Sequence, residues 1–305
     1  MGETTFVAGV WLLYAVHRLF GRPLFRLLLL PVVAVQWCSN ARLRAASLQY
    51  LQRLHAARPG LFPRTPGWRE GLRHVGLFAE TLLDKLLAIA GRYPWERVSE
   101  CDLERVERAR REGQGGVFIT AHMGCLELCR VIGQQKARLD VTVLVHTRHA
   151  QAFNRILKRL DPQSALKLLE VSDFGPATAV QLQQIVAAGG WVAIAGDRVP
   201  LHSQQVVTVN FLGHPAPLPV GPYVLASLLR CPLVLLSCLH TRTGYEIRFE
   251  TLAERVELPR AQRAAALARH AQIYADALQR RVSESPYDWF NFFAFWDRPD
   301  AMPSA

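Results

Sequence analysis

A histidine and a glutamate, His122 and Glu127, stand five residues apart where an apolar stretch gives way to a turn. The segment Gly115–Arg130 reads GGVFITAHMGCLELCR. Residues five apart on one ideal helix point about 140° away from each other, so the two side chains can meet only if His122 lies in the turn before a helix. Gly124 permits such a tight turn, and Glu127 then falls in the first helical turn.

This pair would have a definite chemistry. A carboxylate that accepts a hydrogen bond from one imidazole nitrogen fixes the tautomer of the ring and makes the other nitrogen a better base. The backbone amides at the N-terminus of the following helix can hold an oxyanion or a phosphate. One turn would therefore supply a general base, its orienting carboxylate and an anion site. Taken alone, the pattern also fits two polar residues on the rim of an ordinary strand-to-helix turn.

Strands and helices alternate around this turn. The apolar runs that predict strands are Val117–Ala121, Val141–Val145, Leu166–Val171, Trp191–Ala195, Val206–Phe211, Leu233–Leu239 and Tyr245–Phe249. The segments that predict helices are Arg42–Arg58, Trp68–Tyr93, Asp102–Glu112, Phe153–Leu160, Pro176–Ala187, Val220–Arg230 and Arg260–Ser283. The alternation predicts an α/β fold with a mostly parallel central sheet flanked by helices. Ligands of such sheets bind at the carboxyl ends of the strands, where His122, Arg148 and Asp197–Arg198 fall.

The N-terminus differs from the rest of the chain, and we expect a segment 1–40 that associates with a membrane ahead of a domain 41–305. Residues 1–75 carry ten Arg, no Lys and two Glu, which is +8 of the net charge of +11. The uncharged runs Thr4–Val16 and Leu27–Ala41 are each shorter than the roughly 20 residues of a simple spanning helix. Arginines among apolar residues suit a helical segment that meets anionic head groups, and a soluble helical hairpin is the alternative.

Several other kinds of site are missing from the sequence. It contains no GxSxG, P-loop, GxGxxG or HExxH motif, which removes the commonest hydrolase, nucleotide-binding and zincin interpretations. Its six cysteines form no CxxC pair, so the sequence favours reduced thiols and predicts no metal site. The basic residues lie among apolar ones, and we find no nucleic-acid-binding motif, so nucleic acid is not an expected partner.

The segment TAHMGCLEL resembles the HX4(D/E) block of the lysophospholipid acyltransferase superfamily. The wider layout is similar to the bacterial lipid A late-acyltransferase branch, which includes lauroyl and myristoyl transferases. Three later segments support the resemblance by their order: VLVHTRHAQAFNRILKRL, AIAGDRVP and VNFLGHPAPLPVGPYVLASLLRCPLVLLSCL. The resemblance covers roughly residues 42–296. It departs from the family at Leu126, where Trp is usual, and at Asp197-Arg198, where Asp-Gln is frequent, and these departures concern the acceptor more than the chemistry.

The resemblance implies a membrane-associated acyltransferase. Such an enzyme moves a fatty acyl or related chain from an acyl carrier protein or coenzyme A thioester to a hydroxyl or amine of a lipid or glycolipid acceptor, without a further cofactor. His122 would be the general base and Glu127 would orient it, and no covalent acyl-enzyme is needed. The substrate-binding residues that the resemblance implies are Arg130, Arg148, Asn154, Asp197 and Arg198.

The implied location is the cytoplasmic face of the bacterial inner membrane, with the lipid surface, the acceptor and an acyl carrier protein as partners. Two alternatives stay open: a thioester or ester hydrolase that uses the same pair to activate water, and a catalytically silent lipid-binding protein. The aromatic tail YDWFNFFAFW resembles acyltransferases of bacterial aryl polyene pathways, which would move the acceptor away from lipid A. This tail could cap the core, wall an acyl pocket, or place Trp289 and Trp296 in the membrane interface.

Overall fold

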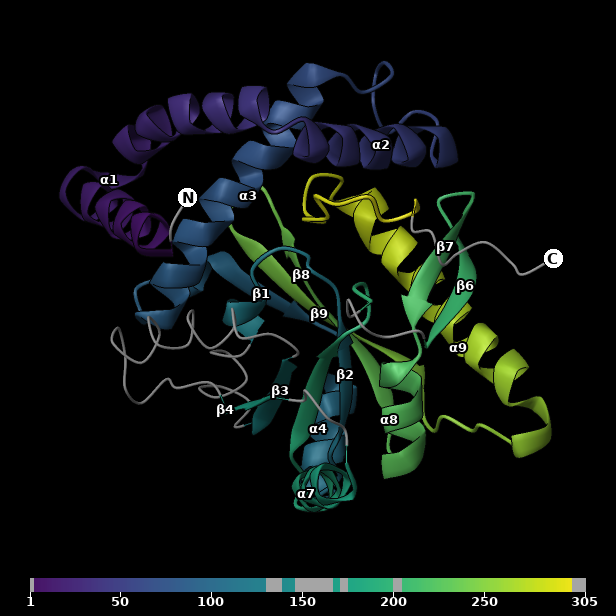
Figure 1. Ribbon diagram of the computed structural model, residues 1–305. Coiled ribbons are helices and arrows are strands. Elements are labelled where there is room, and N and C mark those ends of the chain that lie inside the picture. Colours follow the sequence, from purple (N-terminus) through teal and green to yellow (C-terminus); the bar gives the residue numbers. More distant parts are fainter. Residues whose placement is uncertain (1–2, 130–138, 146–166, 171–174, 200–204, 298–305) are drawn as a thin grey trace.

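The computed structural model describes residues 3–129, 139–145, 167–170, 175–199 and 205–297 (Figure 1). Its central sheet has the strand order β1-β9-β8-β2-β5-β3-β4 within these residues. The strands are β1 (Val98–Cys101), β2 (Gly116–Thr120), β3 (Val141–Val145), β4 (Lys167–Glu170), β5 (Trp191–Ala195), β8 (Leu233–His240) and β9 (Tyr245–Ala253). Neighbouring strands are parallel except β8 and β9, which are antiparallel. The prediction of a mostly parallel sheet is therefore confirmed.

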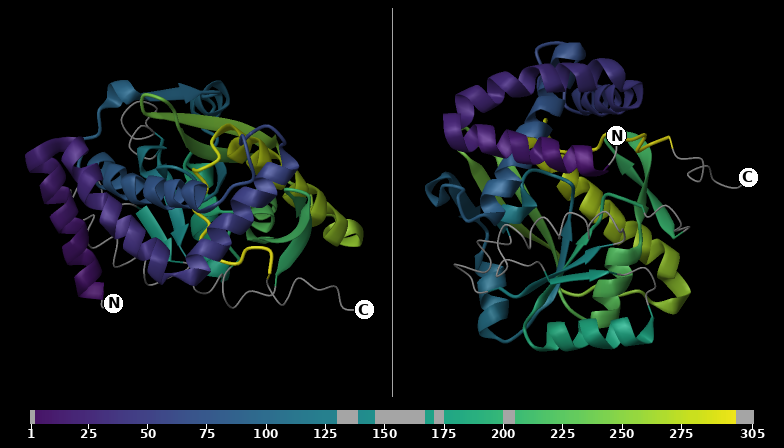
Figure 2. Two further views of the ribbon diagram at one scale, coloured as in Figure 1. Left: turned by 90° about the horizontal axis from the view of Figure 1, so that it is seen from above. Right: turned by 60° about the vertical axis from the view of Figure 1, so that its left-hand side comes forward.

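Helices cover both faces of the sheet, as Figures 1 and 2 show. Their bounds are α1 (Glu3–Ser39), α2 (Ala41–Ala57), α3 (Trp68–Ile89), α4 (Glu104–Arg111), α7 (Pro176–Ala187), α8 (Gly221–Leu229) and α9 (Arg263–Glu284), with 3-10 turns η1 (Trp95–Arg97) and η3 (Arg260–Gln262). Val117 and Ile119 of β2 pack in one core with α7, α8 and α9, while Phe118 between them packs in a second core with α3 and α4. This alternation is what a strand buried on both faces requires.

A small antiparallel hairpin stands apart from the main sheet. Strands β6 (Val206–Phe211) and β7 (His214–Pro219) pair with each other and pack against α9. The sequence predicted β6 but not β7, because β7 carries three prolines, which lack the amide hydrogen of a central strand. A two-stranded hairpin tolerates them because each of its strands has an open edge.

Helix α1 bends at Gly21, whose φ of 76° lies outside the helical region, and it packs against α3 (Figure 2). Arg22 pairs with Asp84 of α3, and Arg26 pairs with Glu80 at 2.8 Å. Arg22 and Arg26 thus pair with acids of the protein, although Arg26 stays exposed, and Leu19, Leu30 and Val35 are among the exposed apolar residues of the same helix.

The N-terminal helix is longer than the uncharged runs within it, each of which is too short to span a bilayer. The structure has one helix within the described residues, Tyr14–Ser39, that is long and apolar enough to cross a membrane, with 26 residues and a mean hydropathy of 1.5. The difference arises because this stretch runs across the bend at Gly21 and includes Arg22 and Arg26, both of which pair with α3.

Candidate active site

Two neighbouring parallel strands place His122 beside Asp197. In the register of β2 and β5, Thr120 lies opposite Ala195, and the amide of Gly196 continues the ladder by donating to the carbonyl of Thr120 at 2.8 Å. His122 and Asp197 each stand two residues beyond the last strand residue. The register alone therefore brings the two residues face to face at the carboxyl edge of the sheet.

Asp197 holds His122 through two hydrogen bonds. Nδ1 of His122 lies 2.8 Å from Oδ1 of Asp197, and the backbone amide of His122 donates to Oδ2 at 2.8 Å. The indole N–H of Trp289 donates to the same Oδ2 at 2.9 Å. Burial opposes the charge of Asp197, but the charge of His122 and these hydrogen bonds outweigh burial and lower the pKa of the carboxyl. Asp197 is therefore an anion, and it accepts a hydrogen bond from Nδ1–H of His122.

The arrangement leaves Nε2 of His122 as the basic atom. The side chain of His122 is 36% exposed, whereas that of Asp197 is 2% exposed. Among the described residues, no hydrogen bond engages Nε2. An imidazole whose Nδ1–H is held by a buried carboxylate, and whose Nε2 is open, has the geometry of a general base.

Glu127 has a different partner from the one predicted. It lies in the first turn of a helix that begins at Leu126, as expected, but its Oε1 is 3.2 Å from Nζ of Lys85 in α3. Burial opposes the charge of Lys85, but the carboxylate of Glu127 outweighs burial and raises the pKa of the ammonium. The carboxylate that holds Nδ1 is Asp197, because the turn directs His122 toward the end of β5 while the helix directs Glu127 toward α3. A catalytic role for Glu127 stays a prediction.

The turn itself depends on Gly124. Its φ is 57°, and a Cβ at this position would approach the carbonyl oxygen of Cys238 at 1.9 Å. The amides of His122, Met123 and Gly124 donate to Asp197, Ala121 and Asp288, respectively. These amides are therefore already hydrogen-bonded within the protein. An oxyanion site built from backbone amides would have to begin at the helical turn that starts at Leu126.

The aromatic tail forms the floor of the site. The amide of Phe290 donates to the carbonyl of His122 at 2.8 Å, and Met123 and Trp289 form an antiparallel bridge. Trp289 is completely buried and Trp296 is 7% exposed. The tail thus caps the core, and its tryptophans are not interface anchors.

The remaining predicted residues divide into two groups. Arg198 is exposed beside Asp197, with its guanidinium 5.6 Å from the ring centroid of Phe293, and its charge acts on Lys85. Arg130, Arg148 and Asn154 lie outside the described residues. The structure therefore gathers His122, Glu127, Asp197 and Arg198 at one edge.

Lys85 and Trp289 were not among the predicted site residues. Lys85 gave a signal, since it is the one lysine of α3 and interrupts the apolar run LLDKLLAIA. Trp289 gave none beyond its place in an aromatic tail, because its contact with Asp197 spans 92 residues of sequence.

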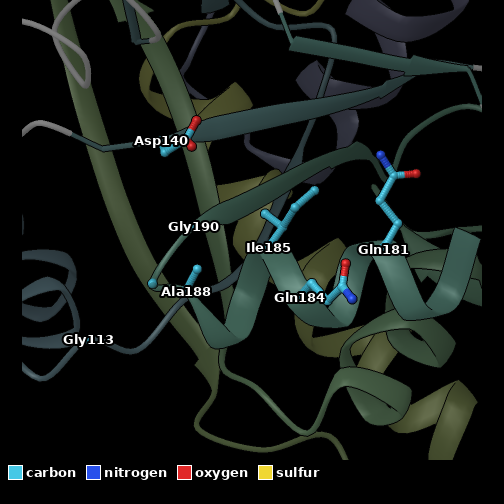
Figure 3. A pocket seen from close by; sticks show the side chains of 8 residues that line it. Gly113, Asp140, Gln181, Gln184, Ile185, Ala188 and Gly190 are labelled. Atoms are coloured by element: carbon cyan, nitrogen blue, oxygen red, sulfur yellow. The ribbon is translucent and has the colours of Figure 1, made fainter.

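A separate surface hollow lies at the opposite edge of the sheet (Figure 3). Its lining residues are Gly113, Asp140, Gln181, Gln184, Ile185, Ala188, Gly189 and Gly190. These residues precede β2, β3 and β5 or belong to α7, so the hollow is remote from His122. Within the described ranges, no group of three or more His, Cys, Asp or Glu residues is arranged to hold a metal ion.

Comparison with protein families agrees with the chemistry that this geometry indicates. Residues 89–298 match the bacterial lipid A biosynthesis acyltransferases. The chain belongs to this family. It is therefore an acyltransferase of bacterial lipid metabolism, which confirms the resemblance noted in the sequence, and the family implies a lipid acceptor from lipid A biosynthesis. The apolar helix α1 in a chain of this family indicates membrane association. A search of curated proteins found no match.

The family match covers the edge of the sheet that carries His122 but not all of its surroundings. It includes β2, β5 and the tail through Trp289, and it begins at the last residue of α3. Lys85 and helix α1 therefore lie outside the matched region.

Proposed function

We propose that this acyltransferase moves a fatty acyl chain from a thioester to a hydroxyl or amine of a lipid A precursor or related glycolipid, with His122 as the general base. The observation that carries the proposal is the contact of 2.8 Å between Nδ1 of His122 and the buried Asp197, which leaves Nε2 open. The role predicted for Glu127, orienting the base, passes to Asp197.

The proposed reaction needs one base and no covalent intermediate with the enzyme. Nε2 of His122 takes the proton of the acceptor hydroxyl as its oxygen attacks the thioester carbonyl, and Asp197 stabilises the imidazolium that results. The tetrahedral intermediate then collapses, the carbon–sulfur bond breaks, and the proton on Nε2 passes to the departing thiolate. One ester bond forms, one thioester bond breaks, and His122 returns to its starting state.

Lys85, Glu127 and Arg198 would form the polar rim of this site. The positive charges of Lys85 and Arg198 lie close enough to act on each other, and Glu127 balances that of Lys85 at 3.2 Å. Such a rim suits a phosphate-bearing donor or acceptor, since charged groups in a partly dry site bind phosphate strongly. Arg198 would contact substrate here, and Arg130, Arg148 and Asn154 remain proposed contacts of the same kind.

The location follows from the two sides of the reaction. The exposed apolar surface of α1 would enter the lipid that contains the acceptor. A water-soluble acyl carrier protein or coenzyme A thioester would reach the site from the cytoplasm. We therefore propose the cytoplasmic face of the inner membrane.

The test follows the label of a radiolabelled acyl carrier protein thioester in membranes that carry wild-type protein or His122→Ala, with a total lipid extract as the source of acceptor. We expect label in a new lipid with the wild type only, and that lipid names the acceptor. Label released only as free fatty acid would point to hydrolysis. Equal labelling by both proteins would exclude His122 as the base.

A further inference from the structure

A second histidine–aspartate pair lies at the end of the neighbouring strand. His240 is the last residue of β8, which pairs in parallel with β2. Its Nδ1 bonds Oδ1 of Asp288, and its backbone amide donates to Oδ2 at 2.6 Å. His122 makes the same two contacts with Asp197. The ends of β2 and β8 therefore each carry a histidine whose Nδ1 and backbone amide bond the same aspartate carboxylate.

The second pair lies in more buried surroundings than the first. The ring of His240 lies against that of Tyr245, with the ring centroids 4.2 Å apart. Asp288 is completely buried, and its Oδ2 accepts a further hydrogen bond from the hydroxyl of Ser285 at 2.6 Å. This pair thus fixes Asp288 in place, and its histidine is less exposed than His122, at 19% against 36%.

The residue after Asp288 reaches the catalytic carboxylate. The carbonyl of Asp288 accepts from the amide of Gly124 at 3.1 Å, and the indole N–H of Trp289 donates to Oδ2 of Asp197 at 2.9 Å. With the bond from Phe290 to the carbonyl of His122, three consecutive residues of the tail contact the histidine, its turn and its carboxylate.

Two N-terminal helices hold the other side of Trp289. Its carbonyl accepts from Nε2 of His74 in α3 at 2.9 Å, and Nδ1 of His74 accepts from the hydroxyl of Ser47 in α2 at 2.9 Å. The ring of Tyr50 packs edge-on against the indole, with the ring centroids 4.9 Å apart. The backbone of Trp289 is therefore held by His74, and its indole packs against Tyr50.

We propose that Trp289 is a positioning residue for acyl transfer, which holds Asp197 through its indole N–H, and that the His240–Asp288 pair fixes the segment that carries it. The inference rests on the proposed function of His122. A carboxylate held by this donor keeps Oδ1 directed at Nδ1 of His122 and shares part of its charge. Without the donor, Oδ2 keeps only the backbone amide of His122 as a partner, so the carboxylate is less firmly held and more basic.

The test compares Trp289→Phe with Trp296→Phe. Trp296 belongs to the same buried tail, and its indole nitrogen has no hydrogen-bond partner among the described residues, so it is a matched control. We expect Trp289→Phe to lower kcat about ten- to a hundredfold, the size of a hydrogen bond to a charged group, with KM for the acceptor little changed.

The pH dependence of the rate provides a readout that a loss of packing would not move. A more basic carboxylate favours the protonated ring, so the acid limb of the pH–rate profile should shift to higher pH in Trp289→Phe and stay in place in Trp296→Phe. Replacement of Trp289 by 3-benzothienylalanine keeps the bicyclic shape without the N–H and should give the same shift.

Three outcomes bear on the inference. Wild-type kcat and pH profile in the benzothienyl variant would overturn it. An equal loss of kcat from Trp289→Phe in an Asp197→Asn background would also overturn it, because the effect would not pass through Asp197. Absence of acyl transfer in the wild type would instead overturn the proposed function, so the two failures are distinguishable.

Discussion

The ends of β2 and β8 carry the same histidine–aspartate arrangement in different surroundings. At the end of β2 the side chain of His122 is 36% exposed, and at the end of β8 that of His240 is 19% exposed and covered by Tyr245. Both rings use Nδ1 for a buried carboxylate. The comparison teaches that the same hydrogen bond prepares both rings as bases, and that exposure of the side chain is what sets His122 apart.

The largest difference in the rate of acyl transfer should lie between substitutions of His122 and His240. We expect His122→Ala to lower the rate of acyl transfer about a thousandfold or more, because it removes the base. His240→Ala should cost about tenfold or less, since the backbone amide of residue 240 still holds Asp288. Acyl transfer assays in purified membranes measure both. A greater loss from His240→Ala would reverse the roles assigned to the two pairs.

The next largest difference should lie between the effects of substituting Asp197 and Glu127, the two carboxylates near His122. Asp197→Asn removes the acceptor of the Nδ1 proton and should lower kcat about a thousandfold, because the wrong tautomer becomes available. Glu127→Gln should have a smaller effect on kcat, since Glu127 meets Lys85. Steady-state kinetics on the two matched amide variants decide the point. Equal losses would show that both carboxylates act on the base.

Gly124 lies in the turn of His122, and its amide donates to the carbonyl of Asp288. It therefore connects the two histidine–aspartate pairs, and its substitution tests whether they form one structural unit. Gly124→Ala forces a Cβ toward the carbonyl oxygen of Cys238 in a backbone with positive φ, and we expect a loss of about 2–4 kcal/mol in the free energy of unfolding. Gly213→Ala is the control, because its φ is also positive at 78° but nothing lies within 4 Å. Denaturant unfolding in detergent measures both, and equal losses would remove the steric argument.

The smallest effect concerns the histidine that holds Trp289. Burial lowers the pKa of His74 to about 4 from an ordinary value of 6.5, so the unfolded chain binds a proton before the folded protein does. This group leaves the free energy of unfolding unchanged above pH 6.5 and should lower it by about 2–3 kcal/mol between pH 6.5 and pH 4.5. His74→Gln should flatten this part of the pH profile of the unfolding free energy. An unchanged slope would mean that other groups cause the acid sensitivity.

The sequence predicted the sheet well because its signals are local. Val141–Val145, Trp191–Ala195 and Pro176–Ala187 match their elements to the residue, since apolar runs bounded by turn residues mark such elements directly. Strand order has no such local signal. The carboxylate of His122 was therefore sought at Glu127, five residues away, while the neighbouring strand supplies it from Asp197.

The aromatic tail beneath His122 was hard to predict for the same reason. Trp289 was recognised only as part of an aromatic tail, because nothing local to it encodes a contact with a residue 92 positions earlier. The pairing of the α1 arginines could not be predicted for a related reason. Their partners Glu80 and Asp84 lie on a helix that the sequence pattern could predict but could not place beside α1.

Helix α1 also balances a charge inside the rest of the protein. Asp84 is 2% exposed, accepts a hydrogen bond from the hydroxyl of Tyr245 at 2.9 Å, and pairs with Arg22. A shortened chain without its first 40 residues would lose both the cation that pairs with Asp84 and the helix that packs on α3. Asp84→Asn removes the carboxylate that this cation balances, so we expect it to destabilise the shortened chain less than the full chain.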